Sequence, residues 1–148
     1  MKTTLLFSLA VVILLPACSS MQKSKEAQKK IERAQEDARR TQDVSFQGFL
    51  GRLRKAVAKR DTQMLSTMIT PNFGYRLEPL GEGPGAFQYW TENGIWPELE
   101  MVLREPFLPN GNYMVAPSQF VSDPEYRGYR AGMALVNGSW RFAYFVTN

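Results

Sequence analysis

The fold of this chain is decided by the stretch Tyr126-Arg-Gly-Tyr-Arg-Ala-Gly-Met-Ala-Leu-Val-Asn-Gly-Ser-Trp-Arg-Phe-Ala-Tyr-Phe-Val146. Its Asn137-Gly138 pair separates two runs of residues that favour β-strands, and such a pair is the strongest short-range signal for a β-hairpin. The reason is that a type I′ turn needs φ > 0 at both central residues. The stretch therefore predicts two antiparallel strands joined by a two-residue loop.

A two-residue loop sets the register of the hairpin, because side chains alternate between the two faces of a strand. The predicted pairs are Val136 with Ser139, Leu135 with Trp140, Met133 with Phe142, Ala131 with Tyr144, and Tyr129 with Val146. The last four pairs share one apolar face, which we expect to be core. The other face is predicted to carry Arg130, Gly132, Ala134, Arg141, Ala143 and Phe145.

The composition fits one domain with appendages and limits the chemistry that we expect. The chain has 148 residues, 44% of them hydrophobic, with one Cys and no His. A single Cys cannot form an internal disulfide, and the lack of His removes the commonest general base and the commonest metal ligand. We therefore expect no cofactor, no metal site and no catalytic residues.

The net charge of +4 is unevenly distributed along the chain. Residues 22–60 hold twelve Lys and Arg against five Asp and Glu, whereas residues 61–148 hold five against nine. The basic character thus belongs to the N-terminal segment and gives no sign of a nucleic-acid footprint on the folded body. We expect no nucleic-acid partner.

The first twenty residues predict a secretion signal. Lys2 precedes an apolar run over residues 5–15, which is too short to span a bilayer comfortably. The run ends in Leu15-Pro16-Ala17-Cys18, which resembles the bacterial lipobox, where a small residue precedes a Cys that is diacylated before the signal is removed. Pro16 departs from the usual Ala, Ser or Thr. The alternative is an ordinary signal peptide cleaved near Ala17, with a free thiol left over.

The lipobox resemblance implies that residues 1–17 are a signal peptide and that Cys18 carries fatty-acyl chains such as palmitate. Ser19, rather than Asp, follows the Cys, which in a two-membrane bacterium implies the periplasmic face of the outer membrane. Several acyl chains anchor a protein stably where one would be marginal. The implied partner of Cys18 is therefore the lipid bilayer of the cell envelope.

Residues 18–43 are predicted to be a charged tether. Residues 21–43 are rich in Lys, Glu, Gln, Arg and Ala and contain no Gly or Pro, which favours helix. One interpretation is a stalk whose basic surface touches anionic lipid or cell-wall polymer. The other is a solvated helical or disordered linker.

Residues 44–148 are predicted to form a single α+β domain, with N-terminal helices packed on a curved, mainly antiparallel sheet that ends in the long hairpin. Helices are expected over residues 44–60, 62–69, 86–92 and 97–103, and further strands over residues 73–77, 113–116 and 118–121. Asp61 is the expected N-cap of the second helix. The Gly-rich residues 81–85 lack the Gly-Lys-Ser/Thr ending of a phosphate loop and are predicted to be a flexible surface loop.

Two groups of residues are candidates for ligand binding. Arg130 and Arg141 share the mixed face of the hairpin near Tyr126, and such a group suits an anionic ligand such as a carboxylate. The alternative is that the arginines face solvent or pair with Glu105 or Asp123. The second group is the aromatic cluster Phe87, Tyr89, Trp90, Trp96 and Phe107. It is either a ligand-binding wall, with Trp90 and Trp96 at its centre, or core packing.

Loose motifs suggest a fold family. Lys59-Arg60-Asp61, then Met64-Leu65 and Pro71-Asn72-Phe73, look like the opening of nuclear-transport-factor-2-like domains. That resemblance covers residues 44–148 and implies a curved sheet wrapped over helices in a cone. Enzymes of this fold usually place a His or Asp deep in the cone, and this chain has no His.

A second resemblance is carried by Tyr129-Arg130-Ala131, Gly138-x-Trp140-Arg141 and Phe145-Val146. The same ending occurs in uncharacterised modules of exported bacterial proteins, some of which flank an SH3-like domain. No activity comes with that resemblance, and fold alone does not choose a function.

We expect an exported, membrane-anchored cell-envelope lipoprotein with a non-catalytic domain that binds an envelope protein or plays a structural part. That hypothesis predicts a filled cone. The alternative is a small-ligand binder or sensor, which predicts an open pocket lined by Trp90, Trp96 and tyrosines. An enzyme would need two polar residues that converge in a pocket.

Overall fold

The computed structural model describes Lys29, Arg33, Arg39 and residues 43–148. Residues 42–148 belong to one compact unit. The predicted signal peptide, Cys18 and most of the predicted tether lie outside the described residues, so these expectations stay predictions.

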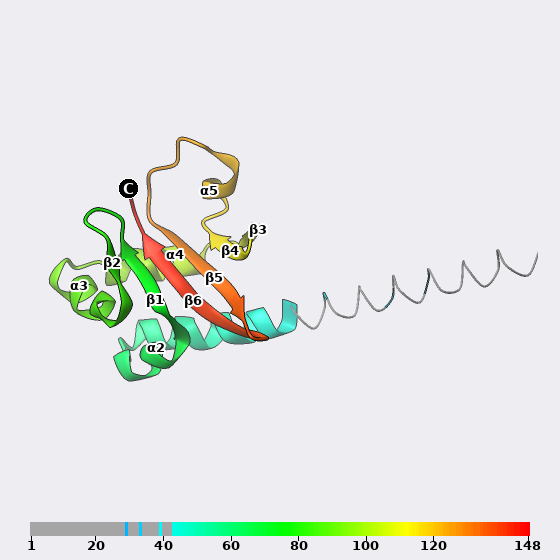
Figure 1. The fold of residues 1–148 in the computed structure, drawn as a ribbon, viewed down its shortest axis with the longest axis horizontal. Coiled ribbons are helices and arrows are strands. Elements are labelled where there is room, and N and C mark those ends of the chain that lie inside the picture. The colour runs from blue at the N-terminus through cyan, green and yellow to red at the C-terminus, as the bar shows by residue number, and fades with distance from the viewer. Residues whose placement is uncertain (1–28, 30–32, 34–38, 40–42) are drawn as a thin grey trace, which may run out of the picture. The chain divides into compact units, whose positions relative to one another are not determined.

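Six strands form one mixed sheet in the order β2-β1-β6-β5-β4-β3 (Figure 1). The strands are β1 (Ile69–Arg76), β2 (Gly81–Glu82), β3 (Leu108–Asn110), β4 (Tyr113–Ala116), β5 (Arg130–Val136) and β6 (Ser139–Val146). All neighbouring strands are antiparallel except β1 and β6, which are parallel. The predicted α+β fold, with helices packed on a curved and mainly antiparallel sheet, is confirmed.

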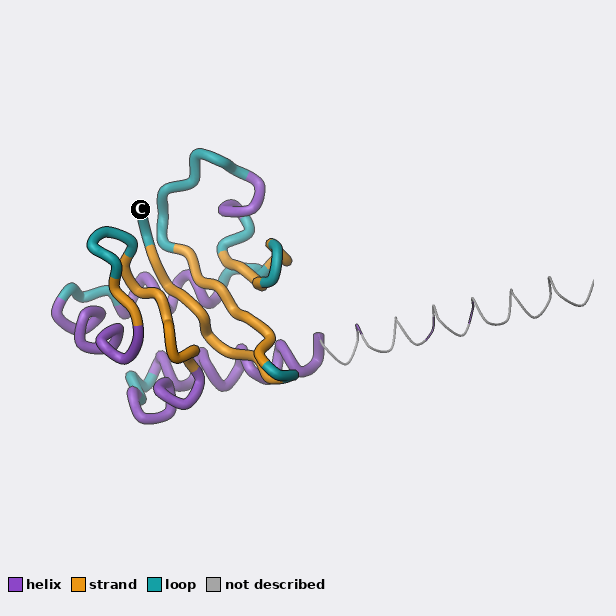
Figure 2. Tube along the Cα trace, in the orientation of Figure 1, coloured by secondary structure: helices purple, strands orange, loops and turns teal. Residues whose placement is uncertain are grey.

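The main helices pack on one face of this sheet. Residues 43–58 are helical, and the other helices are α2 (Thr62–Met68), α3 (Ala86–Glu92), α4 (Trp96–Arg104) and the short α5 (Gln119–Ser122). In Figure 2 the 43–58 helix and α4 run behind the strands, and no helix crosses the front of β1, β6 and β5. The sheet therefore has a covered face and an open face.

The core fills the space between the helices and the covered face. The apolar stripe predicted for the 43–58 helix is confirmed, because every member is buried: Phe46, Phe49, Leu50, Leu53, Ala56 and Val57. Trp90 of α3 stands at the centre, and its ring meets those of Phe73, Trp96 and Phe145 edge-on at centroid distances of 5.7, 5.1 and 5.9 Å. Aromatic edge-to-face packing of this kind adds to the stabilisation from buried area.

Local signals place the ends of α2, α3 and α4. The Asp61 side chain accepts a hydrogen bond from the backbone N of Met64 at 2.9 Å, which confirms the predicted N-cap. The chain leaves α3 at Asn93-Gly94, where Gly94 has φ +66°. Pro97 lies in the first turn of α4, where a missing N–H leaves no helical hydrogen bond unmade.

The structure confirms the predicted turn of the hairpin, but the strand pairing farther from the turn differs from the prediction. Asn137 and Gly138 have φ of 49° and 76°, and Met133 pairs with Phe142 as predicted. Beyond that pair β6 bulges, so that the remaining pairs are Gly132 with Tyr144, Ala131 with Phe145, and Arg130 with Val146. The predicted pairing of Ala131 with Tyr144 and of Tyr129 with Val146 was wrong.

The bulge at Ala143 matters because one extra residue reverses the faces of the side chains that follow it. Phe145, expected on the mixed face, is 1% exposed in the core. Tyr144, expected in the core, shares the open face with Gly132.

Three shorter segments also differ from the expectation. Residues 81–85 are not an open loop but form β2 and a 3-10 turn over Gly83–Gly85. In β2, Gly81 packs closely on the ring of Tyr75. The segment after Ser118, predicted as a strand, is the helix α5. The edge strand β3 was not predicted, because Pro109 at its centre argues against a strand.

Candidate anion site on the open face of the sheet

The open face of β4, β5 and β6 carries a layer of tyrosines over glycine. The Tyr144 ring lies directly on Gly132, so closely that a Cβ added there would collide with the ring. Tyr113 meets the Tyr144 ring edge-on at 5.4 Å between centroids. Gly132 thus provides the flat place in the sheet on which Tyr144 rests.

Arg130 stands on this face at the start of β5. Its guanidinium carbon is 4.9 Å from the ring centroid of Phe120 in α5, which is a cation–π distance. Its Nη2 donates to Oδ1 of Asn148 at 2.8 Å. Its Nη1 is buried and has no hydrogen-bond partner. Among the described residues, no carboxylate lies within ion-pair distance of Arg130.

The charge of Arg130 reaches two neighbouring phenols. Burial raises the pKa of Tyr144 to about 12, Arg130 opposes that rise, and Tyr113 adds to it. Burial also raises the pKa of Tyr126. The charge of Arg130 opposes this rise, and the charge of Glu105 adds to it. Both phenols therefore keep their protons at neutral pH.

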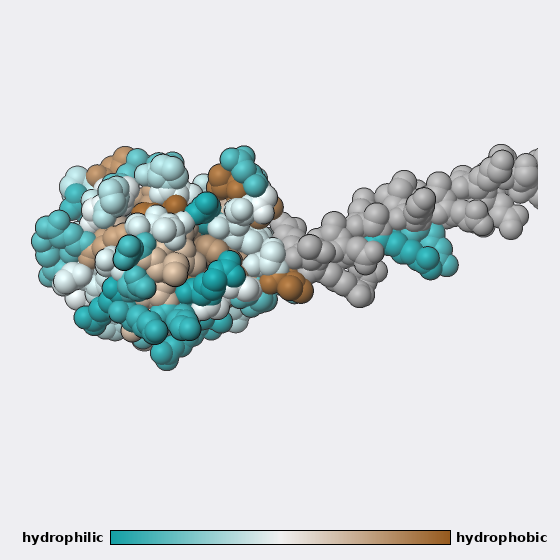
Figure 3. All heavy atoms as spheres, turned by 90° about the horizontal axis from the view of Figure 1, so that it is seen from below, coloured by the Kyte–Doolittle hydropathy of each residue, from teal (hydrophilic) through white to brown (hydrophobic). Residues whose placement is uncertain are grey.

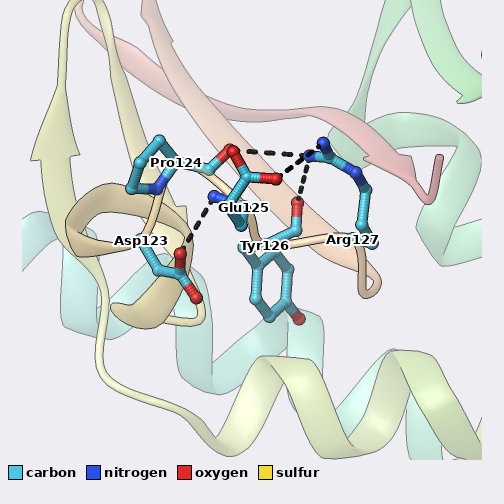
Figure 4. A network of polar contacts seen from close by, with 5 residues as sticks. All are labelled: Asp123, Pro124, Glu125, Tyr126 and Arg127. Atoms are coloured by element: carbon cyan, nitrogen blue, oxygen red, sulfur yellow. Dashed lines mark hydrogen bonds and ion pairs between the residues drawn. The ribbon is translucent and has the colours of Figure 1, made fainter.

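The loop before β5 is held by its own polar groups (Figure 4). Oδ1 of Asp123 accepts from the backbone N of Glu125 at 2.9 Å. Arg127 donates to the Glu125 carboxylate at 3.3 Å and to the backbone oxygen of Pro124 at 3.5 Å. These contacts order the segment that carries Tyr126 toward Arg130.

Tyr126 lies on the inner side of that loop. Figure 4 shows its ring pointing toward α4, away from the side chain of Arg127. Its hydroxyl donates to the backbone oxygen of Tyr129 at 2.8 Å, and its ring meets Phe120 at 6.2 Å. Tyr126 and Arg130 are therefore both neighbours of the Phe120 ring.

The structure brings Arg130 and Tyr126 together but places Arg141 elsewhere. Arg141 lies opposite Ala134, four residues along β5 from Arg130, which is roughly 13 Å of strand. It donates to the backbone oxygen of Thr67. In the part of the chain that the structure describes, neither arginine forms an ion pair with Glu105 or Asp123.

Trp90 and Trp96 lie in the core, 1% and 2% exposed. Nε1 of Trp96 donates to Oγ1 of Thr91 at 3.1 Å, whereas Nε1 of Trp90 is buried without a partner. Neither ring has an exposed face, and neither lines the cavities beside Arg130 or along the 43–58 helix.

Two surface cavities flank the Arg130 group. One, of about 340 Å³, lies between α4 and α5 and is lined in part by Glu105, Ser118 and Tyr126. The other, of about 470 Å³, is lined in part by Arg76 and Asn148. Tyr126 and Asn148 each belong to one cavity wall and also neighbour Arg130, but Arg130 itself lines neither cavity.

Several residues of this group were not predicted from the sequence. Phe120, Asn148, Tyr144 and Tyr113 reach Arg130 or its neighbours only through the bulge in β6 and the path of the loop. Within residues 43–148, no cluster of three or more carboxylates offers a set of metal ligands. None of the helices described is both long enough and apolar enough to cross a bilayer.

No protein-family model matches this sequence, and no curated protein is significantly similar to it.

Proposed function

We propose that this chain is an exported, lipid-anchored protein of the cell envelope whose α+β unit binds a partner without catalysing a reaction. The Arg130 group is the binding site, and it takes a carboxylate of the partner. The observation that carries this proposal is the guanidinium of Arg130, which has one buried nitrogen without a partner and no paired carboxylate among the described residues.

The chemistry of the group suits a carboxylate. A guanidinium presents parallel N–H groups that match two carboxylate oxygens, and such charge-assisted bonds are stronger than neutral ones. Stacking on Phe120 and the bond to Asn148 hold the guanidinium in place, which lowers the entropy lost on binding. An unpaired buried N–H costs about 1–3 kcal/mol, and a ligand that reaches Nη1 and accepts a hydrogen bond from it relieves that cost.

The same group favours binding over catalysis. Burial raises the pKa values of Tyr126 and Tyr144 above the ordinary value of a phenol, so neither hydroxyl gives up its proton near neutral pH. Donors with fixed protons hold an anion without exchanging protons with it, whereas general acid–base catalysis needs a group that titrates near the working pH.

The alternative of a small ligand inside the cone has no comparable support. It requires Trp90 and Trp96 to line an open cavity, and both rings are buried against other core side chains.

Carboxylate binding is tested by titrating the full-length Cys18→Ser chain, in detergent, with acetate while the guanidinium ¹⁵N signals are followed by NMR. We expect saturable shifts of the Arg130 signals that chloride at equal ionic strength does not produce. The NMR signals of the neighbouring Tyr144 should also shift with acetate. Arg130→Gln should abolish this shift of the Tyr144 signals, and Arg141→Gln should leave it intact. An unchanged Tyr144 response in Arg130→Gln would refute the site.

The lipid anchor is tested separately, by growing cells with a fatty-acid probe. The wild-type protein should take up the label and Cys18→Ser should not. If the wild type takes up none, the anchor is wrong, whatever the acetate titration shows.

A further inference from the structure

The charges of residues 43–148 are segregated between one helix and the rest of the unit. Residues 43–60 hold five Lys and Arg against one Asp, a net charge of +4. Residues 61–148 hold five against nine, a net charge of −4. The unit is therefore neutral as a whole, and its positive charge is concentrated beside a single element.

The five cations are Arg52, Arg54, Lys55, Lys59 and Arg60, and all five are exposed. In the described part of the chain, none of them forms an ion pair. Arg52, Lys55 and Lys59 recur at spacings of three and four, so they share a side of the helix away from its buried stripe. Arg54 and Arg60 lie against α4 instead, and we call the five side chains together the basic face.

Two contacts fix parts of the basic face against α4. Nε of Arg54 donates to the backbone oxygen of Leu103 at 2.7 Å, which leaves its two terminal nitrogens available. The guanidinium carbon of Arg60 is 6.0 Å from the ring centroid of Trp96. The basic face is thus partly pre-organised, which lowers the entropy cost of binding an anion.

A hollow of about 300 Å³ lies between the 43–58 helix and α4. Its floor contains the apolar residues Val57, Ala58 and Leu103, and its rim carries the cations Arg54, Lys55 and Arg104 together with the carboxylate of Glu100. Arg104 contacts Glu100 at 3.6 Å, and its side chain is 75% exposed, so this contact neutralises the rim only weakly. Cations around an apolar floor match the boundary between a phosphate headgroup and an acyl chain.

The surface on the side of the 43–58 helix carries many hydrophilic side chains. Figure 3 views the unit from below, the side where this helix and α2 lie in Figure 1, and shows hydrophilic side chains around a central area of weakly hydrophobic ones. A polar, cationic and exposed surface of this kind suits a headgroup layer rather than insertion into the acyl chains.

We propose that the basic face docks the unit on an anionic phospholipid surface, with a lipid phosphate held in the hollow between Arg54, Lys55 and Arg104. This inference rests on the proposed lipid anchor, which would keep the unit at a high effective concentration beside that surface. Each cation near an anionic bilayer strengthens attachment by about fivefold, and salt weakens the attraction. Residues 61–148, with their net charge of −4, are repelled by the anionic surface. The unit therefore favours the orientation in which the basic face lies on the bilayer.

That orientation connects the basic face with the Arg130 group. The 43–58 helix packs on the covered face of the sheet, and Arg130 stands on the open face. A unit that lies with its basic face on the bilayer presents Arg130 toward the aqueous side, where a carboxylate partner would meet it.

The test uses full-length Cys18→Ser protein, which carries no acyl chain, in co-sedimentation with two kinds of vesicle. One kind is phosphatidylcholine alone, and the other is an equal mixture of phosphatidylcholine and phosphatidylglycerol. Because the apolar run over residues 5–15 can enter both kinds, the measured quantity is the gain in affinity due to phosphatidylglycerol. We expect a clear gain that falls as salt is raised.

The triple variant Arg52→Gln/Lys55→Gln/Lys59→Gln should reduce this gain by about 100-fold, at about fivefold per charge. The matched control is Lys23→Gln/Lys25→Gln/Lys29→Gln, which removes the same charge from the tether. Equal losses in the two variants would overturn the proposal, since the tether would then bind as well as the basic face. Thermal melting of the triple variant should match that of the parent chain.

A fluorophore at a single position shows whether the basic face itself contacts the vesicle or whether the chain is attached through another segment. A fluorophore on Ala58→Cys, in the Cys18→Ser chain, should shift to the blue with phosphatidylglycerol vesicles, and one on Ser139→Cys should not. An equal shift at both positions, or binding to soluble polyglutamate with no gain on the mixed vesicles, would overturn the proposal. Because these chains lack Cys18, the result does not depend on whether the anchor exists.

Discussion

At the scale of single residues, the close contact of Tyr144 with Gly132 shapes the open face. Gly132→Ala places a Cβ where the Tyr144 ring lies, and overpacking of this kind typically costs about 1–3 kcal/mol. Urea unfolding should show that loss. The matched control is Gly51→Ala, an open helical position where nothing lies within 4 Å of the added Cβ and where we expect a gain of about 0.5–1 kcal/mol. Equal effects of the two changes would contradict this contact.

Tyr144 also makes stability depend on pH in alkaline solution. Its folded pKa of about 12 lies above the unfolded value of about 10, so between these pH values the unfolded chain ionises first. Its contribution to stability is therefore complete below pH 10 and is lost as the pH rises toward 12. Urea midpoints of the wild type should fall across this window more steeply than those of Tyr144→Phe. Parallel curves would show that Tyr144 does not titrate abnormally.

Arg130 could be chosen from the sequence as a candidate site residue, but its surroundings could not be predicted. A cation between small and apolar strand residues is visible in the sequence. Its partner Asn148 lies 18 residues away, and Phe120 reaches it from a helix that the sequence pattern predicted as a strand. Those contacts depend on the path of a loop, which local propensity does not determine.

At the scale of elements, α2 depends on its N-cap. Asp61→Ala removes the acceptor for the backbone N of Met64, and the loss of such a cap typically costs about 1 kcal/mol. Asp61→Asn keeps an acceptor and should retain most of the stability. Chemical denaturation of both variants checks the expectation, and an alanine variant as stable as the asparagine variant would contradict it.

The elements with strong local signals were predicted, and those set by neighbours were not. The 43–58 helix, the cap of α2 and the Asn137-Gly138 turn each follow from residues close in sequence. The bulge at Ala143 leaves no such mark, since a single alanine fits either face of a strand. Phe120 and Val121 favour strands, yet the chain turns there as a helix after Pro117.

At the scale of the whole molecule, Trp90 is the centre of the core. It is 1% exposed, and its ring also contacts Phe142 and Phe87, at 6.4 and 5.5 Å. Trp90→Ala should therefore cost about 3–5 kcal/mol in the free energy of unfolding. Met64→Ala, at a side chain that is 49% exposed, is the control and should change stability by less than about 0.5 kcal/mol. A small effect of Trp90→Ala would show that the interior is not packed as described.

The fold class followed from an amphipathic helix and one hairpin, but the order of the strands did not. The parallel pairing of β1 with β6 joins segments far apart in the chain, and no periodicity encodes it. The resemblance to nuclear-transport-factor-2-like domains stays a prediction.

The position of β6 between β1 and β5 makes this one strand the join of the sheet. Without β6, the pair β1-β2 and the group β5-β4-β3 would be separate half-sheets, each with an unpaired edge where β6 belongs. Unpaired edges attract strands of other molecules, so a chain in which β6 has not docked exposes two such edges. One strand of eight residues closes both edges together.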